Sequence, residues 1–159
     1  MQNKGKLFEK EFAESLGWFN RSHPDFWYMR WPDYKDWIAV SPKLFAPKAP
    51  CDYVALYNGT FYAMELKSTR GTRFSFNWIK EHQKEHLLNV SSAGGRGYFI
   101  FSTRVRNIRA CAIPIEEYMI LENELSAKGH RSINSEILIS AGQSLIRDGS
   151  PWDLSPLFT

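Results

Sequence analysis

Two carboxylates and a lysine lie at matched positions around a turn-forming dipeptide. Asp52 precedes Asn58-Gly59 by as many residues as Glu65 follows it, and Lys67 comes two residues after Glu65. Asn-Gly between two β-prone runs is a strong hairpin signal, because both turn residues favour positive φ. A two-residue loop would set Asp52 directly opposite Glu65, and the alternation of a strand would place Lys67 on the same face. The spacing therefore predicts two acids and a lysine together at the open end of a hairpin.

Opposed carboxylates of this kind repel each other. At a separation of ~5 Å and an effective dielectric constant of ~20, the repulsion is about 3 kcal/mol. Protonation of one acid removes it, and so does a divalent cation bound between them. Mg²⁺ takes one or two carboxylates together with waters and phosphate oxygens, and Mn²⁺ is expected to substitute. We therefore predict metal-dependent phosphodiester hydrolysis with Asp52 and Glu65 as ligands and Lys67 at the phosphate or the attacking water. The alternative is two ordinary surface acids beside a lysine.

The helix expected over residues 77–90 carries three further candidates. Gln83 shares the apolar stripe of Leu87, so its polar group must find partners, either at the active site or on the backbone. His82 and His86 are one helical turn apart, which is possible zinc spacing, but no cysteine or further acid completes a zinc pattern. We interpret the two histidines as exposed or DNA-facing.

Positive charge is concentrated in the middle of the chain. Residues 67–109 contain nine Lys or Arg against two Glu, although the whole chain has a net charge of only +3. Such a stretch suits a polyanion such as DNA, and a solvated basic surface is the alternative. The residues expected to contact DNA are Lys4, Lys6, Arg30, Arg70, Arg73, Lys80 and Lys84.

The remaining pattern predicts one α/β domain over residues 1–159 with a mixed β-sheet flanked by helices. Residues 18–50 form an aromatic and proline-rich excursion, and residues 126–159 show only weak periodicity. A helix over residues 6–16 is expected to end at Gly17. Further helices are expected over residues 77–90 and 115–125, and further strands over residues 26–31, 97–103 and 109–113.

Composition excludes several classes of protein. The hydrophobic fraction of 43% is enough for a core, and no apolar run approaches the ~20 residues that span a bilayer. The two cysteines form neither a disulfide framework nor a metal pattern, and the opening residues are polar and charged. We expect a protein of the reducing cytoplasm with no membrane partner.

Asp52 followed by Glu65-Leu66-Lys67 resembles the core of the PD-(D/E)XK nucleases, with the proline separated as Pro50-Cys51-Asp52. Within that superfamily the chain looks like the RecU-type Holliday junction resolvases. Segments that carry this resemblance are Cys51-Asp52-Tyr53 through Lys67, residues 72–85 with Glu81-His82-Gln83-Lys84-Glu85-His86, the stretch from Gly129-His130-Arg131-Ser132-Ile133 onward, and Gly5-Lys6-Leu7-Phe8-Glu9.

The resemblance implies a restriction-endonuclease-like core, cleavage of four-way junctions and a homodimer. It also implies that Glu9 is a third active-site carboxylate and that the Leu66 carbonyl is a metal ligand. The expected catalytic set is then Asp52, Glu65, Lys67, Gln83 and Glu9, and the expected metal ligands are Asp52, Glu65, Leu66 and Glu9.

Departures from the family pattern leave the substrate open. Resolvases of this type carry a protruding stalk where residues 18–50 lie here, and the two do not match; a long N-terminal arm is also missing. A restriction-like or repair endonuclease on duplex DNA, and a non-catalytic DNA-binding module of the same fold, remain as alternatives.

Overall fold

The computed structural model describes residues 4–33, 48–104, 108–147, 149 and 151–159. Within these residues the main sheet has six strands in the order β1-β2-β3-β5-β6-β8, and β4 and β7 form a separate pair. Only β3 and β5 pair in parallel, so the sheet is mixed, as predicted. The strands are β1 (Trp27–Arg30), β2 (Tyr53–Tyr57), β3 (Thr60–Thr69), β4 (Arg73–Ser75), β5 (Arg96–Thr103), β6 (Arg109–Pro114), β7 (Ser132–Asn134) and β8 (Gln143–Leu145).

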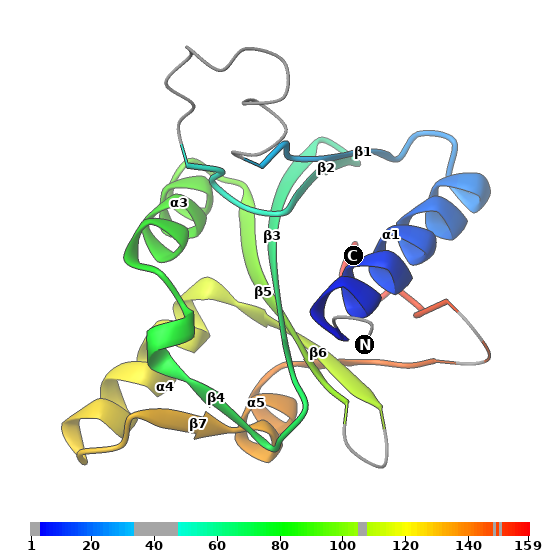
Figure 1. Ribbon diagram of the computed structural model, residues 1–159. Coiled ribbons are helices and arrows are strands. Elements are labelled where there is room, and N and C mark those ends of the chain that lie inside the picture. Colours follow the sequence, from blue (N-terminus) through cyan, green and yellow to red (C-terminus); the bar gives the residue numbers. More distant parts are fainter. Residues whose placement is uncertain (1–3, 34–47, 105–107, 148, 150) are drawn as a thin grey trace, which may run out of the picture.

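Helices cover both faces of the sheet (Figure 1). One face packs against α1, and the other packs against α3, α4 and α5, which gives two separate layers of apolar core. The helices are α1 (Lys4–Ser22), α3 (Glu81–Ser92), α4 (Ile115–Ala127) and α5 (Ser135–Ala141), with a 3₁₀ turn η1 (Phe76–Trp78) before α3. The predicted arrangement of a mixed sheet flanked by helices is confirmed.

The β2–β3 hairpin has the predicted turn and the predicted register over most of its length. Asn58 and Gly59 have φ values of 49° and 74°, the positive values that a two-residue loop of this type requires. The pairs run from Tyr57↔Thr60 to Tyr53↔Met64. On its other edge β3 pairs with β5, so the strand that carries Glu65 and Lys67 lies in the middle of the sheet.

The first helix is longer than predicted. Gly17 does not end α1, which continues to Ser22. Phe19 extends the apolar stripe of Phe12 and Leu16 by nearly one more turn. Its ring packs edge-on against the ring of Phe26, with 4.8 Å between the ring centroids. Burial of this ring favours further helix by more than the intrinsic cost of one glycine, which is about 1 kcal/mol.

The other predicted elements are present with shifted ends, and the tail contains more structure than its pattern indicated. The helix expected over residues 77–90 is η1 followed by α3. Residues 126–159 include α5 and β8, and they return to α1, where the Trp152 N–H donates to the Ser15 Oγ at 2.8 Å. Most of the predicted excursion after β1 falls on residues 34–47, which lie outside the described residues.

The cysteines and the described helices bear on the classes of protein considered from the sequence. Both cysteines are free and buried, as expected for a chain without a disulfide framework. Among the described helices, none combines the length and the apolar character needed to cross a membrane.

Candidate active site

Asp52 leaves the strand ladder at the open end of the hairpin. Its N–H donates to the Met64 carbonyl at 3.1 Å, so Asp52 and Tyr53 both face Met64, an arrangement like that of a β-bulge. The pairing therefore ends at Tyr53↔Met64, and the predicted direct Asp52–Glu65 pair is wrong in this detail. The Asp52 Oδ2 instead accepts the Leu66 N–H at 2.7 Å.

This hydrogen bond also orients the Leu66 carbonyl. The N–H and C=O of one residue in an extended strand point to the same side. Because the Leu66 N–H points to the Asp52 carboxylate, its carbonyl is directed to the same edge of β3, beyond the end of β2. The bulge thus brings a carboxylate and a backbone carbonyl to one opening in the sheet.

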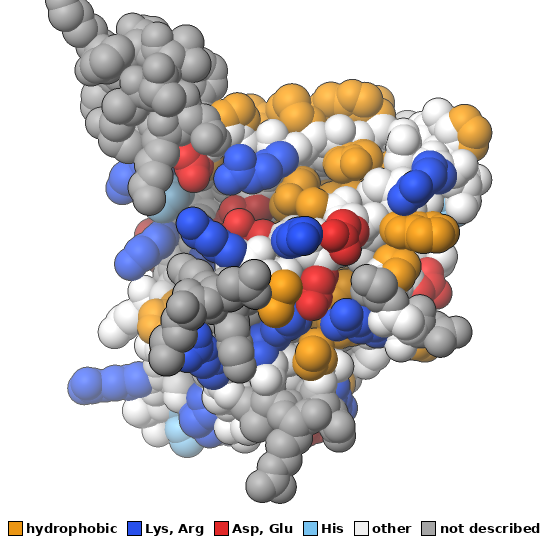
Figure 2. Space-filling model, turned by 45° about the vertical axis from the view of Figure 1, so that its right-hand side comes forward, with side chains coloured by type: hydrophobic (Ala, Val, Ile, Leu, Met, Phe, Trp, Pro, Cys, Tyr) orange, Lys and Arg blue, Asp and Glu red, His pale blue; other side chains and the backbone are white. Residues whose placement is uncertain are grey.

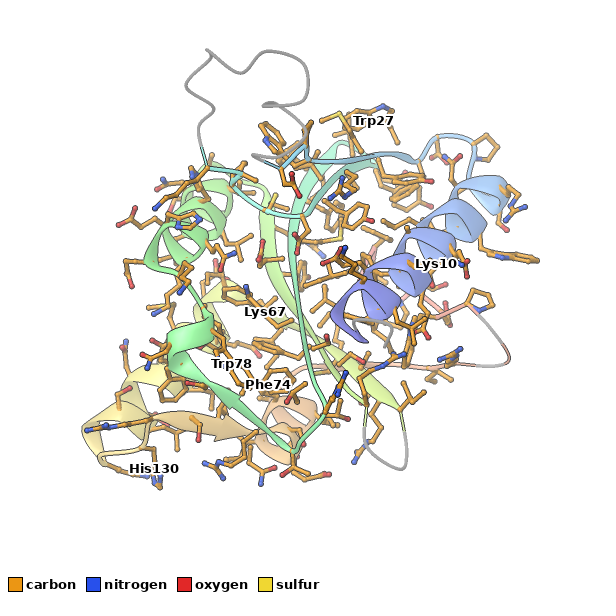
Figure 3. The ribbon with its side chains drawn as sticks, in the orientation of Figure 1. Lys10, Trp27, Lys67, Phe74, Trp78 and His130 are labelled. Carbon is orange, nitrogen blue, oxygen red and sulfur yellow. The ribbon has the colours of Figure 1, made fainter. Side chains whose placement is uncertain are left out.

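Glu65 and Lys67 both contact Gln83 of α3. Figure 3 labels Lys67, whose side chain lies between β3 and the segment of η1 and α3. The Lys67 Nζ donates to the Glu65 Oε1 at 2.9 Å and to the Gln83 Oε1 at 3.0 Å. The Gln83 amide donates to the Glu65 Oε1, and its oxygen also accepts the Lys80 N–H at the start of α3. Both open alternatives for Gln83 are therefore present together: it caps the helix backbone and contacts the two candidate catalytic side chains.

The acids at this opening outnumber the nearby lysine. Glu65 is only 4% exposed, and burial, reinforced by the Asp52 carboxylate, raises the pKa of Glu65 to about 7. Burial also raises the pKa of Asp52, although the Leu66 N–H and the Lys67 charge act against it. For Glu9, burial and the Asp52 charge raise the pKa as well. An environment that raises three carboxyl pKa values at once is one in which added positive charge is strongly favoured.

A cleft of about 620 Å³ leads to Asp52 between the first half of α1 and the end of β1. Glu9 and Asp52 line it together with Lys6 and Arg30, and also with Lys10, which the sequence pattern did not single out. On one face of the molecule, acidic side chains gather with Lys and Arg around them, below a row of hydrophobic side chains (Figure 2).

Asp52 and Glu65 lie together at the opening, and Glu9 lies in the adjoining cleft. Among the described residues, no group of three or more His, Cys, Asp and Glu side chains is arranged to hold a metal ion. Glu9 shares the cleft with Asp52 without completing such a group, so its role as a metal ligand stays a prediction. In the described part of the chain, His82 and His86 belong to no such group, and their ring centroids lie 6.5 Å apart.

The predicted DNA-contacting residues divide into exposed and buried ones. Arg70 and Lys80 are exposed, and so is Arg73, whose Nε donates to the Ser132 Oγ at 2.8 Å. Lys84 is buried and donates to Glu122 at 2.6 Å, so its prediction as a DNA contact is wrong. The spacing of Lys84 from Lys80 indicated one surface, but the packing of α4 on α3 covers Lys84.

The remaining members of that predicted set lie near the cleft or outside the described side chains. Lys6 and Arg30 are exposed cleft residues, and Arg30 lies 3.8 Å from Asp33. Lys4 begins α1, and its side chain lies outside those described.

Comparisons with known proteins provide evidence that is independent of this geometry. The family model of Recombination protein U, RecU, matches residues 33–151, well over half of the chain. The chain belongs to the RecU family. The matched residues include Asp52, Glu65, Lys67 and Gln83, so the RecU match covers the opening described above, while Glu9 lies outside it.

Two curated RecU relatives are similar over long stretches. The Holliday junction resolvase RecU of Mycoplasmopsis pulmonis is 28% identical over 142 residues, covering 80% of this chain and 89% of that protein. The Holliday junction resolvase RecU of Bacillus pumilus is 26% identical over 113 residues, covering 70% of this chain and 54% of that protein. A solved structure, the Holliday junction resolvase Hjc of Archaeoglobus fulgidus, matches with a TM-score of 0.49 and 14% identity over 84% of this chain and 93% of that one.

Proposed function

We propose that this RecU-family chain is a DNA endonuclease that resolves four-way junctions by metal-dependent hydrolysis of a phosphodiester bond. The observation that carries the proposal is the opening at the end of β2, where the Asp52 and Glu65 carboxylates meet beside Lys67. Membership of the RecU family and the names of the two curated relatives support the choice of substrate.

The residues present fit a hard divalent cation. Two carboxylates with raised pKa values and a carbonyl directed at the same edge are oxygen donors, which Mg²⁺ and Mn²⁺ prefer. Asp52, Glu65 and the Leu66 carbonyl would hold the ion, with Glu9 as a further candidate from the cleft wall. When bound, the ion would polarise the scissile phosphate and lower the pKa of a bound water.

The protein's own side chains orient the reaction. Lys67 lies against Glu65 and can donate to a non-bridging phosphate oxygen or to the attacking water, where charge develops in the transition state. Gln83 limits the freedom of both side chains through its two hydrogen bonds to them. Water attack on phosphorus breaks the bond to the 3′ oxygen, which takes up a proton, so the products carry a 5′-phosphate and a 3′-hydroxyl.

The same proposal extends to the assembly and its setting. Symmetric resolution of a junction needs two cuts in opposed strands, and a homodimer with one opening per protomer would supply them. The bacterial origin of the two curated relatives supports a setting in the cytoplasm of a prokaryotic cell or a phage-infected host.

The test is cleavage of a labelled four-way junction and of a linear duplex of the same sequence, each with and without Mg²⁺. We expect Mg²⁺-dependent nicks at opposed positions of the junction and much slower cutting of the duplex. Lys67→Ala should bind the junction and leave it uncut. Equal cutting of both DNAs would favour a duplex endonuclease, and no cutting of either DNA with Mg²⁺ or Mn²⁺ would reject nuclease activity.

A further inference from the structure

A second cleft, of about 510 Å³, opens between the β2–β3 hairpin and the second half of α3. Val54 and Ala63, which pair across the hairpin, are buried in its lining, and Val90 of α3 also lines it. Two aromatic side chains, Trp31 and Phe61, contribute further apolar surface. An apolar cleft with aromatic walls is the usual form of a site for a flat organic group.

This apolar cleft adjoins the candidate active site. Trp31 and Cys51 line both clefts, so the two share a wall. Ala63 precedes Glu65 by two residues on β3, and two residues of strand span about 7 Å. A group seated against Ala63 would therefore lie about 7 Å along the strand from the Glu65 position.

Polar groups at the apolar cleft match the edge of a nucleobase. Asn89 and His86 line it from α3. An asparagine side chain offers a donor and an acceptor together, the pair that reads an adenine edge, and histidine offers one of each.

We propose that the apolar cleft receives an unpaired nucleobase of the DNA substrate, from a nucleotide next to the scissile phosphate. This inference rests on the proposed nuclease function, which supplies the phosphate at Asp52 and Glu65. The base stacks on Trp31 or Phe61, and Asn89 contacts its edge. At the branch point of a four-way junction the bases are paired but the stack is interrupted, so unpairing a base there costs less than within an intact duplex. The cleft thus favours branched DNA and gives the cut a base preference.

The test uses four-way junctions with an unpaired 2-aminopurine at the nucleotide beside the scissile bond, bound in Ca²⁺ to limit cleavage. Ala93→Phe fills the cleft from an exposed position at the end of α3. Ala127→Phe is the matched control, because Ala127 is also exposed and ends α4. We expect binding to quench the probe in the wild type and in Ala127→Phe, and Ala93→Phe to lose the quenching and bind the junction about 10-fold more weakly.

Asn89→Leu gives a second reading that does not depend on filling the cleft. With each of the four bases at the probe position, the wild type should show a base preference in Mg²⁺-dependent cleavage, and Asn89→Leu should cut all four at similar rates. Equal quenching in Ala93→Phe and Ala127→Phe would overturn the proposal. A change in sedimentation of Ala93→Phe without any change in quenching would also overturn it, and would assign the cleft to a second copy of the chain.

The two levels of inference fail differently. A wild type that quenches the probe but cuts no DNA would reject the nuclease function and leave base binding in place. A wild type that cuts junctions without quenching, and without a base preference, would reject the base site alone.

Discussion

Glu11 and Glu65 are both buried glutamates that contact a cation, and they lie on opposite faces of the sheet. Glu11, on α1, accepts two hydrogen bonds from Arg104, at 2.8 and 3.0 Å, and one from Arg147 at 3.4 Å. Burial acts to raise its pKa, but the hydrogen bond and charge of Arg104, with Arg147, outweigh burial and lower it. Glu65 has Lys67 beside it, and its pKa is raised to about 7 by burial and by Asp52.

The difference is in the local charge balance. Around Glu11, Arg104 and Arg147 both contact one carboxylate, so the ionised form of Glu11 is stable. These ion pairs also join α1 to segments far along the chain. Around Glu65, by contrast, one lysine lies near two carboxylates, and the charge of Glu9 also raises the pKa of Glu65. A fold gains nothing from the second arrangement unless something positive binds there, which distinguishes a scaffold pair from a candidate active site.

The largest expected effect is on cleavage. Glu65→Gln removes the charge while keeping the side chain's size, so it should lower the single-turnover rate of junction cleavage by about 10³-fold or more, equivalent to about 4 kcal/mol. Junction binding in Ca²⁺ and the circular dichroism spectrum should change little. A variant that cuts within about 10-fold of the wild-type rate would remove Glu65 from the reaction.

The next effect is on stability and belongs to the other glutamate. Glu11→Gln leaves the buried Arg104 guanidinium without its carboxylate, so it should lower the free energy of unfolding by about 3–5 kcal/mol. Urea denaturation measures this loss. In metal-free buffer at pH 8, Glu65→Gln should have a free energy of unfolding equal to or higher than that of the wild type. Equal losses of stability in the two variants would contradict the proposed difference between Glu11 and Glu65.

A third effect follows from the raised pKa of Glu65. The metal-free folded state holds a proton at Glu65 up to about pH 7, whereas the unfolded chain loses it near the ordinary value of 4.5. Stability from this group is therefore complete below pH 4.5 and is lost as the pH rises toward 7. Between pH 5.5 and pH 8 the free energy of unfolding should fall by about 2 kcal/mol more in the wild type than in Glu65→Gln.

The stability at pH 8 with added Mg²⁺ or Mn²⁺ is a second test of the raised pKa of Glu65. Because such an ion would bind the ionised carboxylates of the folded state, it should recover stability at pH 8 in the wild type. The same addition should leave the melting temperature of Glu65→Gln nearly unchanged. A wild type with no response to either ion would contradict the assignment of this opening to a metal.

The smallest effect concerns Gln83, which positions Lys67 and Glu65. Gln83→Ala should slow cleavage about 10-fold, about 1.4 kcal/mol, and shift the pH dependence of the rate, because Glu65 loses a hydrogen-bond donor. Gln143→Ala, at an exposed glutamine of the edge strand β8, is the control. A purely structural role for Gln83 would lower stability through the lost helix cap and leave the pH profile in place.

The sequence could predict the hairpin and what its central strand carries. Positive φ at Asn58 and Gly59 is a local preference, and it sets the register that turns Glu65 and Lys67 to one face. The sequence could not predict the bulge that takes Asp52 out of the ladder, since that depends on the Leu66 N–H and the Trp31 N–H, which contact Asp52 from two other segments.

Turn type, strand alternation and helical stripes were determined by the sequence itself, because each depends on residues a few positions apart. Burial and pairing were decided only by the tertiary structure. From the sequence alone Lys84 looks like an exposed cation, but in the fold it is buried and donates to Glu122, 38 positions later. In the same way, Glu11 accepts hydrogen bonds from Arg104, 93 positions later. An ionised group takes its role from the charges and the solvent around it, and these come from parts of the chain that only the fold brings together.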